Sequence, residues 1–123
     1  MSLVYIDIDN FKQVNDGRGH AQGDRVLQQL AEAIDHAARA RIDRGFRVGG
    51  DEFACLLPGS TALQSEAVVA RIREHCARSD RAWVDGPLGL SVGIVEFDAH
   101  EAASGFVLRA DAAMYLQKAS RAP

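Results

Sequence analysis

Three carboxylate residues occupy positions from which a folded chain could bring them together. Asp7 lies at the carboxyl end of an apolar run, and Asp51 and Glu52 lie between two further apolar runs. If the later runs form a hairpin that pairs beside the first, the carboxylates converge at one edge of a sheet. Convergent carboxylates repel each other unless a positive group lies between them. Mg²⁺ suits such a site, because it binds one or two carboxylates together with water and substrate phosphate.

Two glycines precede this acidic pair. Gly49 and Gly50 can adopt the positive φ angles of a tight turn, and a residue without a side chain lets a ligand approach the backbone closely. The pair could therefore leave room for a nucleotide while Asp51 faces its phosphates. Gly-Gly-Asp is equally good hairpin-turn chemistry without any function. Asp7 taken alone could be a solvated strand end, so the hypothesis depends on the combination.

Hydrophobic periodicity predicts the elements that must position these residues. Alternating apolar residues predict a strand over Leu3–Asp9. We expect a polar connection over Phe11–His20. A helix should begin at Asp24, which is a fair N-cap, because apolar residues then recur at three- and four-residue spacing.

The rest of the chain predicts a hairpin around the two glycines, then a helix, a strand and a last helix. Thr61 and Gln64 resemble a capping box at the start of the first of these helices. Ser104 should cap the last helix, with Val107, Leu108, Met114 and Tyr115 facing inward. The predicted ranges are Ile42–Val48 and Phe53–Leu57 for the hairpin, Ala62–Ala77 for the helix, Asp80–Pro87 for a loop, Leu88–Phe97 for the strand and Ser104–Lys118 for the last helix.

The order β-α-β-β-α-β-α predicts an α/β (α+β) fold, a ferredoxin-like βαββαβ mixed sheet with packed helices. The 123 residues suffice for one domain, taken as residues 1–123, and 47% of them are hydrophobic, enough to form a core. No apolar run reaches membrane-spanning length, so we expect this segment to have no membrane contact.

Charge and cysteine content narrow the partners and the compartment. The net charge of −3 argues against nucleic acid as a partner, because phosphate backbones are held mainly by clustered Lys and Arg. Cys55 and Cys76 show no metal-ligand spacing and are expected to be unpaired thiols. Unpaired thiols favour a reducing compartment, so we expect a cytoplasmic location.

Five sequence blocks, in order, resemble those of one protein family. They are Asp7–Asp16 (D-x-D-x-F-K-x-x-N-D), Gly19-His20 with Gly23-Asp24, Arg47–Phe53 (the GGDEF signature), Ser91–Ile94, and Ala110–Tyr115 with Lys118. The chain is therefore similar to the GGDEF domains of diguanylate cyclases. The resemblance implies a fold like those of nucleotide cyclases and polymerase palms. It also implies the condensation of two GTP molecules into cyclic di-GMP with release of pyrophosphate, across two domains that face each other.

The resemblance also assigns roles to the acidic residues. Asp7, the backbone carbonyl of Ile8 and Asp51 would hold Mg²⁺ or Mn²⁺. Asp51 would assist deprotonation of the ribose 3′-hydroxyl, and Glu52 would support the metal site. Gly49 and Gly50 would lie against the nucleotide.

Further residues would bind the substrate. Asn15 and Asp24 would recognise guanine, while Lys12 and Lys118 would hold phosphates, which includes Lys12 in the catalytic set. His20 could touch ribose or phosphate, or it could pack its loop. Asp24 could instead only cap its helix, and Lys118 could be a solvated helix end.

Departures from the family pattern leave two alternatives open. The family's segment before the first strand, with its D-x-L-T-G-L-x-N-R signature, and its last strand are not in this sequence. Of the family's product-inhibition site, Asp43 matches the aspartate, Ala40 replaces the arginine, and Arg39 and Arg71 could contribute. We expect no strong product inhibition. The parent protein would carry sensor or phosphodiesterase domains, and a catalytically inactive GTP-binding module is the alternative function.

Overall fold

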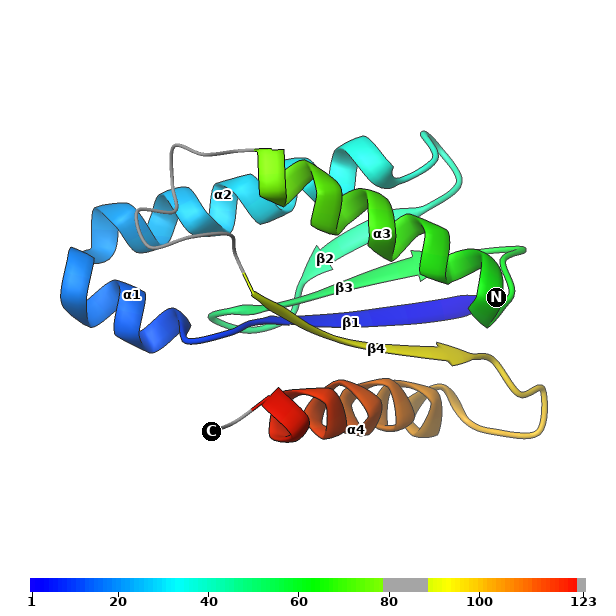
Figure 1. Ribbon diagram of the computed structural model, residues 1–123. Coiled ribbons are helices and arrows are strands. Elements are labelled where there is room, and N and C mark those ends of the chain that lie inside the picture. Colours follow the sequence, from blue (N-terminus) through cyan, green and yellow to red (C-terminus); the bar gives the residue numbers. More distant parts are fainter. Residues whose placement is uncertain (79–88, 122–123) are drawn as a thin grey trace.

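The computed structural model describes residues 1–78 and 89–121, and the predicted loop at Asp80–Pro87 lies outside them. Figure 1 shows helices packed on both faces of a four-stranded sheet. The elements are β1 (Ser2–Ile8), α1 (Phe11–Arg18), α2 (His20–Ala37), β2 (Arg44–Arg47), β3 (Glu52–Leu57), α3 (Ala62–Arg78), β4 (Leu90–Glu96) and α4 (Ala103–Arg121). None of the described helices is both long and apolar enough to cross a lipid bilayer.

The sheet has the strand order β2-β3-β1-β4. This order and the alternation of strands and helices confirm the predicted ferredoxin-like fold class. The order of the elements predicts a mixed sheet, whereas each strand pairing among the described residues is antiparallel. The reason is that β3 returns from β2 as a hairpin and inserts between β2 and β1. Strands β1 and β2 run in the same direction and are thereby separated by β3, which is the split βαβ arrangement.

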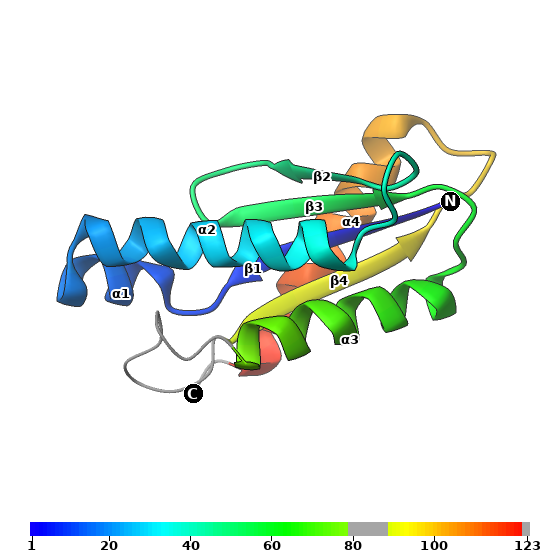
Figure 2. The same cartoon turned by 90° about the horizontal axis from the view of Figure 1, so that it is seen from above.

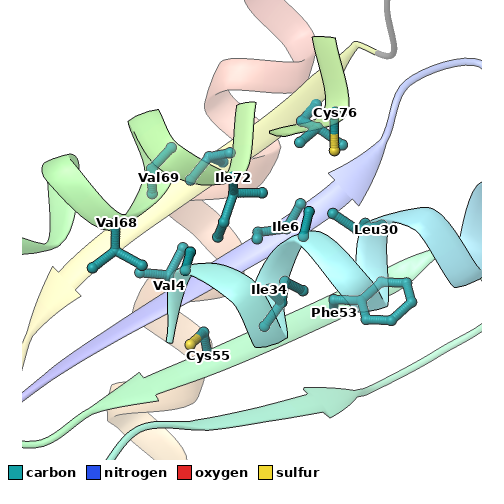
Figure 3. Close-up of a cluster of buried hydrophobic side chains, with 14 of the residues drawn as sticks. Val4, Ile6, Leu30, Ile34, Phe53, Cys55, Val68, Val69, Ile72 and Cys76 are labelled. Carbon is teal, nitrogen blue, oxygen red and sulfur yellow. The ribbon is translucent and has the colours of Figure 1, made fainter. Parts of the chain in front are cut away.

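The central strand β1 is buried on both of its faces. Helices α2 and α3 cover one face of the sheet and α4 covers the other, as Figures 1 and 2 show. Alternate residues of β1 therefore enter different cores: Val4, Ile6 and Ile8 face α2 and α3, and Leu3 and Tyr5 face α4. Figure 3 shows the larger core, in which side chains of α2 and α3 meet those of β1 and β3.

The segment after β1 differs from the prediction, because Phe11–Arg18 forms the helix α1 and not a connection. Phe11 and Val14 pack against the larger core and give α1 an apolar side. Gly19, at a φ of 88°, separates α1 from α2. Helix α2 begins at His20, so Asp24 lies inside the helix and the N-cap interpretation is wrong.

Of the two predicted helix caps at α3 and α4, the first is confirmed and the second is wrong. The capping box of α3 is present: the Gln64 N–H donates to Thr61 Oγ1 at 3.1 Å, and the Thr61 N–H donates to Gln64 Oε1 at 2.9 Å. Helix α4 begins at Ala103, so Ser104 lies within its first turn and is not the N-cap.

The buried side of α4 agrees with the prediction at Met114 and differs from it at the other three residues. Phe106, Ala110 and Met114 are buried at four-residue spacing, while Val107, Leu108 and Tyr115 are exposed. The cause is a close approach to β4, because a Cβ on Gly93 would lie 2.3 Å from the Met114 backbone nitrogen and 2.4 Å from the Ala110 oxygen. The backbone of α4 rests on this glycine, and that contact selects which side of the helix faces the sheet.

Candidate functional site

Asp7 lies at the end of β1, on the sheet face that α4 covers. Its side chain is 4% exposed, and its Oδ2 accepts a hydrogen bond from Lys118 Nζ at 2.7 Å. The other oxygen, Oδ1, is buried and has no hydrogen-bond partner in the described part of the chain. A buried carboxylate oxygen without a partner is costly, so this atom is available to an additional ligand.

The hairpin between β2 and β3 brings the other carboxylates to the same place. Asp7 is opposite Glu52 in the register of β1 and β3. The Ile8 N–H donates to the Asp51 carbonyl at 3.2 Å, and the Gly49 N–H donates to the Glu52 carbonyl at 3.3 Å. The hairpin tip is therefore hydrogen-bonded to the end of β1, as the hypothesis of convergent carboxylates requires.

Arg47 holds the glycine turn from within the hairpin. Its Nε donates to the Gly49 carbonyl at 3.1 Å and its Nη2 to the Gly50 carbonyl at 2.7 Å. Two donors of one rigid guanidinium restrict the turn that precedes Asp51. In the sequence Arg47 is only the first residue of the Arg47–Phe53 motif, and the motif by itself assigns it no role.

The electrostatics of the cluster reflect crowded negative charge. Burial raises the pKa of Asp7 to about 6; the hydrogen bond from Lys118 lowers it and the neighbouring Asp51 raises it. Burial, followed by the charges of Asp111 and Asp51, raises the pKa of Glu52. The hydrogen bond to Asp7 raises the pKa of Lys118. The site thus favours whatever brings further positive charge to Asp7.

The donor set fits a hard divalent cation such as Mg²⁺ or Mn²⁺. Asp7 and Asp51 would supply carboxylate oxygens, and Ile8 would add a backbone carbonyl at the same strand end. No group of three His, Cys, Asp or Glu side chains in residues 1–78 and 89–121 is arranged to hold a metal ion by itself. Oxygens from backbone, water and a substrate would have to complete the coordination shell, as Mg²⁺ commonly requires.

A second group of predicted residues lies on α1 and α2. A Cβ on Gly23 would lie 2.1 Å from Asn15 Oδ1, so the Asn15 amide packs directly on this glycine, next to Asp24. Asp24 is exposed, as are Lys12 on α1 and His20 at the start of α2. In Figures 1 and 2, α1, the start of α2 and the glycine turn lie at the same end of the sheet.

Two acidic residues near the cluster were not predicted as site residues. Asp111 lies seven residues before Lys118 on α4, and its charge acts on Glu52. Asp9 Oδ1 accepts a hydrogen bond from Ser91 Oγ at 2.6 Å, which ties the loop after β1 to β4. The spacing of Asp111 and Lys118, two turns apart on one helix side, was a sequence signal that could have indicated the first of these residues.

The three residues proposed for an inhibitory site also come together. They lie at the other end of α2, where the Asp43 side chain is fully buried and Arg39 Nη2 lies 2.7 Å from its Oδ1. The Arg39 backbone N–H donates to Asp43 Oδ2 at 2.8 Å, and Arg39 Nη2 also donates to the Pro58 carbonyl at 2.7 Å. Burial opposes the effect, but the bonds from Arg39 hold the pKa of Asp43 below its ordinary value. Arg71 Nη2 donates to the Ala37 carbonyl at 3.3 Å beside this pair.

A cavity of about 300 Å³ lies elsewhere, between α2 and β2. Leu27, Ile34, Phe46 and Phe53 are among its lining residues. None of the residues predicted for the site lines it. The candidate site is therefore the carboxylate cluster and the adjoining ends of α1 and α2, not this cavity.

The family profile and the curated relatives that match this chain all belong to one protein family. The sequence profile of the family described as "Diguanylate cyclase, GGDEF domain" matches residues 1–122. Diguanylate cyclase A of Treponema denticola is 38% identical over 122 residues, which cover 96% of this chain and 32% of that protein. The chain spans about a third or less of the length of the curated relatives first matched.

Solved structures agree with the sequence matches. Diguanylate cyclase SiaD of Pseudomonas aeruginosa, solved in complex with its activator SiaC, aligns with a TM-score of 0.87 and 38% identity over 98% of this chain and 46% of that chain. The GGDEF domain of DgcB from Caulobacter crescentus, solved in complex with c-di-GMP, aligns with a TM-score of 0.87 and 31% identity over 98% of this chain and 72% of that chain.

Proposed function

The chain belongs to the GGDEF domain family of diguanylate cyclases, and from this premise we propose that it condenses two GTP molecules into cyclic di-GMP with release of pyrophosphate. The reaction requires Mg²⁺ or Mn²⁺. The observation that carries the proposal is the convergence of Asp7, Asp51 and Glu52 at one sheet edge beside Lys118. Nucleotidyl transfer needs carboxylates that hold a divalent cation and a basic side chain that binds phosphate. The cluster supplies the carboxylates, and Lys118 supplies the basic side chain.

The carboxylate cluster binds the cation and handles the proton in this proposal. Asp7, the Ile8 carbonyl and Asp51 hold the divalent cation, which when bound neutralises phosphate charge and lowers the pKa of the attacking hydroxyl. Asp51 assists removal of the proton from the ribose 3′-hydroxyl. Glu52 supports the cation site, and its raised pKa reflects the charge that surrounds it.

The substrate is held by residues on three helices. The Asn15 amide and the Asp24 carboxylate pair with the guanine edge, and their adjacency through Gly23 supports this assignment. Lys12 and Lys118 bind phosphate oxygens as compact point charges. His20 contacts ribose or phosphate. A side-chain-free turn at Gly49 and Gly50 allows the nucleotide to approach the backbone.

Turnover requires a second copy of the domain. One chain holds one GTP, so the two reacting nucleotides meet only when two domains face each other. We propose a homodimer as the catalytic unit, in the cytoplasm, within a longer parent protein that carries sensor or phosphodiesterase domains. Because the curated relatives are three or more times longer than the match, the dimerising element is expected in the remainder of the parent protein.

We propose that product inhibition through Asp43, Arg39 and Arg71 is weak. Asp43 already forms a forked ion pair with Arg39, and the same guanidinium contacts Pro58. A ligand at this place would have to displace bonds that hold the end of α2. Strong inhibition of the enzyme by added cyclic di-GMP would contradict this part of the proposal.

Product analysis tests the enzyme proposal. The protein, fused to a coiled coil that enforces dimerisation, is incubated with GTP and Mg²⁺, and cyclic di-GMP and pyrophosphate are measured. Asp51→Ala should abolish both products, a loss of at least a hundredfold, because it removes a cation ligand and the proton acceptor. Glu66→Ala, which removes an exposed carboxylate of α3, is the matched control and should retain activity.

The alternative is an inactive GTP-binding regulatory module. Guanine-specific binding without product, even in the coiled-coil fusion, would establish this alternative and reject the enzyme proposal. Product formation that survives Asp51→Ala would show that the assignment of the cation ligands is wrong.

A further inference from the structure

The ion pair between Lys118 and Asp7 joins two residues to which the proposed function gives different partners. Asp7 is assigned to the divalent cation and Lys118 to nucleotide phosphate. In this structure Lys118 Nζ lies 2.7 Å from Asp7 Oδ2, in an ion pair that spans 111 positions of the sequence. The lysine therefore occupies one oxygen of the carboxylate that the cation needs, while Oδ1 has no hydrogen-bond partner among the described residues.

The two partners differ in their freedom to move. Asp7 belongs to β1 and is paired with Glu52 on one side and Ser91 on the other, so its carboxylate is held in the sheet. The Lys118 side chain is 43% exposed and has a flexible four-carbon stem. Any exchange of partners must therefore occur by movement of the lysine.

The charges around the pair determine when the lysine leaves. A cation that binds Asp7 alone places positive charge beside Nζ, and like charges at this separation repel. Asp51, Glu52 and Asp111 offset part of that charge, but they do not free the Oδ2 atom. A triphosphate bound with the cation supplies new anionic oxygens to which the lysine can donate.

We propose that Lys118 is a counter-ion to Asp7 in the nucleotide-free protein and moves to phosphate when nucleotide binds, so that cation and nucleotide bind cooperatively. This inference rests on the proposed function of the same site. It assigns to Lys118 a second role, that of weakening cation binding in the absence of nucleotide. By linkage, the factor by which nucleotide tightens cation binding equals the factor by which cation tightens nucleotide binding.

Direct measurement of Mn²⁺ binding without nucleotide tests the counter-ion role. Mn²⁺ is titrated into wild type, Lys118→Met and Lys12→Met, and free Mn²⁺ is followed by electron paramagnetic resonance. Lys12 is the only other lysine in the sequence and is exposed on α1, so its variant removes an equal charge that is not paired with Asp7. Asp7→Asn identifies the Mn²⁺ site, because binding at this site should be lost.

The expected result is a specific gain of cation affinity. Lys118→Met should lower the Kd for Mn²⁺ by about three- to fivefold, the upper part of the range expected when a competing, partly exposed ion pair is removed. Lys12→Met should remain within about twofold of wild type, since Lys12 is exposed and is not among the side chains that act on the charge of Asp7. Lys118→Arg keeps a cation that can pair with Asp7 and should restore the wild-type Kd.

A second titration adds a non-hydrolysable GTP analogue. In wild type the analogue should tighten Mn²⁺ binding by a larger factor than in Lys118→Met, because only wild type has an ion pair to exchange. Circular dichroism of each variant verifies that the fold is retained.

Several outcomes would overturn the inference. These are an unchanged or raised Kd in Lys118→Met, equal gains in both lysine variants, which would indicate general electrostatics, and no Mn²⁺ binding in any protein at millimolar concentration. Failure of the enzyme proposal is distinguishable, because these titrations involve no turnover. A protein that binds Mn²⁺ as expected but forms no cyclic di-GMP would retain the counter-ion role and lose the proposed activity.

Discussion

Asp7 is a buried acid whose two oxygens are unequally satisfied: one accepts a hydrogen bond from Lys118 and the other has no hydrogen-bond partner among the described residues. Burial and the nearby Asp51 raise its pKa to about 6 even though Lys118 acts in the opposite direction. The ionised form is therefore less stable in the folded chain than in the unfolded chain. A site that destabilises its own carboxylate is one that gains from binding a cation.

The raised pKa predicts a pH dependence of stability in the absence of divalent cations. Between the ordinary value of 3.8 and about 6, the folded chain holds the Asp7 proton more tightly than the unfolded chain. Stability from this group is therefore lost as pH rises through that window, by on the order of 2 kcal/mol. Asp7→Asn, which stays neutral, should gain stability relative to wild type between pH 4.5 and 7 in urea denaturation.

An exposed residue without a titratable group serves as the control for this experiment. Leu63→Ala on α3 should change stability equally at both ends of the pH window. If the curves of wild type and Asp7→Asn remain parallel from pH 4.5 to 7, Asp7 does not have a raised pKa in the folded protein.

The contacts of Arg39 lead to a second prediction at the level of single residues, which concerns thermal stability. Its guanidinium and backbone N–H are the partners of a fully buried carboxylate, Asp43, and its guanidinium also donates to the Pro58 carbonyl after β3. Arg39→Ala should lower the thermal unfolding midpoint by several degrees, because a buried charge would lose its partner. Arg39→Lys should recover only part of the loss, since lysine cannot form the fork. Arg44→Ala, on the exposed strand β2, should change the midpoint little.

At the level of elements, the contact of α4 with β4 determines where Lys118 lies. The helix backbone rests on Gly93, and the buried residues Phe106, Ala110 and Met114 follow from that approach. Lys118 lies one turn after Met114 and so reaches Asp7 on the neighbouring strand. The position of one glycine on a strand is thus coupled to the candidate site.

Gly93→Ala should force α4 away from β4 and destabilise the fold. The added Cβ would lie 2.3 Å from backbone, which cannot move without shifting α4, so the free energy of unfolding should fall by about 2 kcal/mol or more. Gly105→Ala, on α4 itself, has only a Glu101 side-chain atom at 3.8 Å and should raise stability by about 0.5 kcal/mol. Equal changes in both variants in urea denaturation would show that the close approach does not restrict α4.

Elements with a local signal were predicted well. The alternation of β1, the hairpin of β2 and β3 and the capping box of Thr61 and Gln64 each depend on neighbouring residues, and each is present. The expectation of positive φ at Gly49 and Gly50 is wrong, because the described glycines with positive φ are Gly19 and Gly59. Helix α1 was missed because Phe11 and Val14 are only two apolar residues in a polar segment, and their packing on the core stabilises the helix. The cap at Asp24 was wrong because Gly19 starts α2 earlier.

At the scale of the whole molecule, one domain holds half of the proposed reaction. The proposal of two GTP molecules on two facing chains predicts that the specific activity of the free domain rises with protein concentration. The coiled-coil fusion should remove this dependence and be active at the lowest concentration. Product formation measured over a hundredfold dilution tests this, and constant specific activity of the unfused domain would contradict catalysis between two chains.

The sequence by itself determined the family, the strand that carries Asp7 and the hairpin that carries Asp51 and Glu52, because these depend on periodicity, turn chemistry and motif spacing along the chain. Only the tertiary structure decided the pairing of Lys118 with Asp7, the charge of Asp111 beside Glu52, and the side of α4 that is buried. Each of these features depends on contacts of α4 with strands that are distant in the sequence. The distance between α4 and the sheet is set by Gly93, and the strand order places β1 and β3 within reach of the helix. Local pattern holds no information about that separation, so the pairing of Lys118 with Asp7 became visible only in the folded chain.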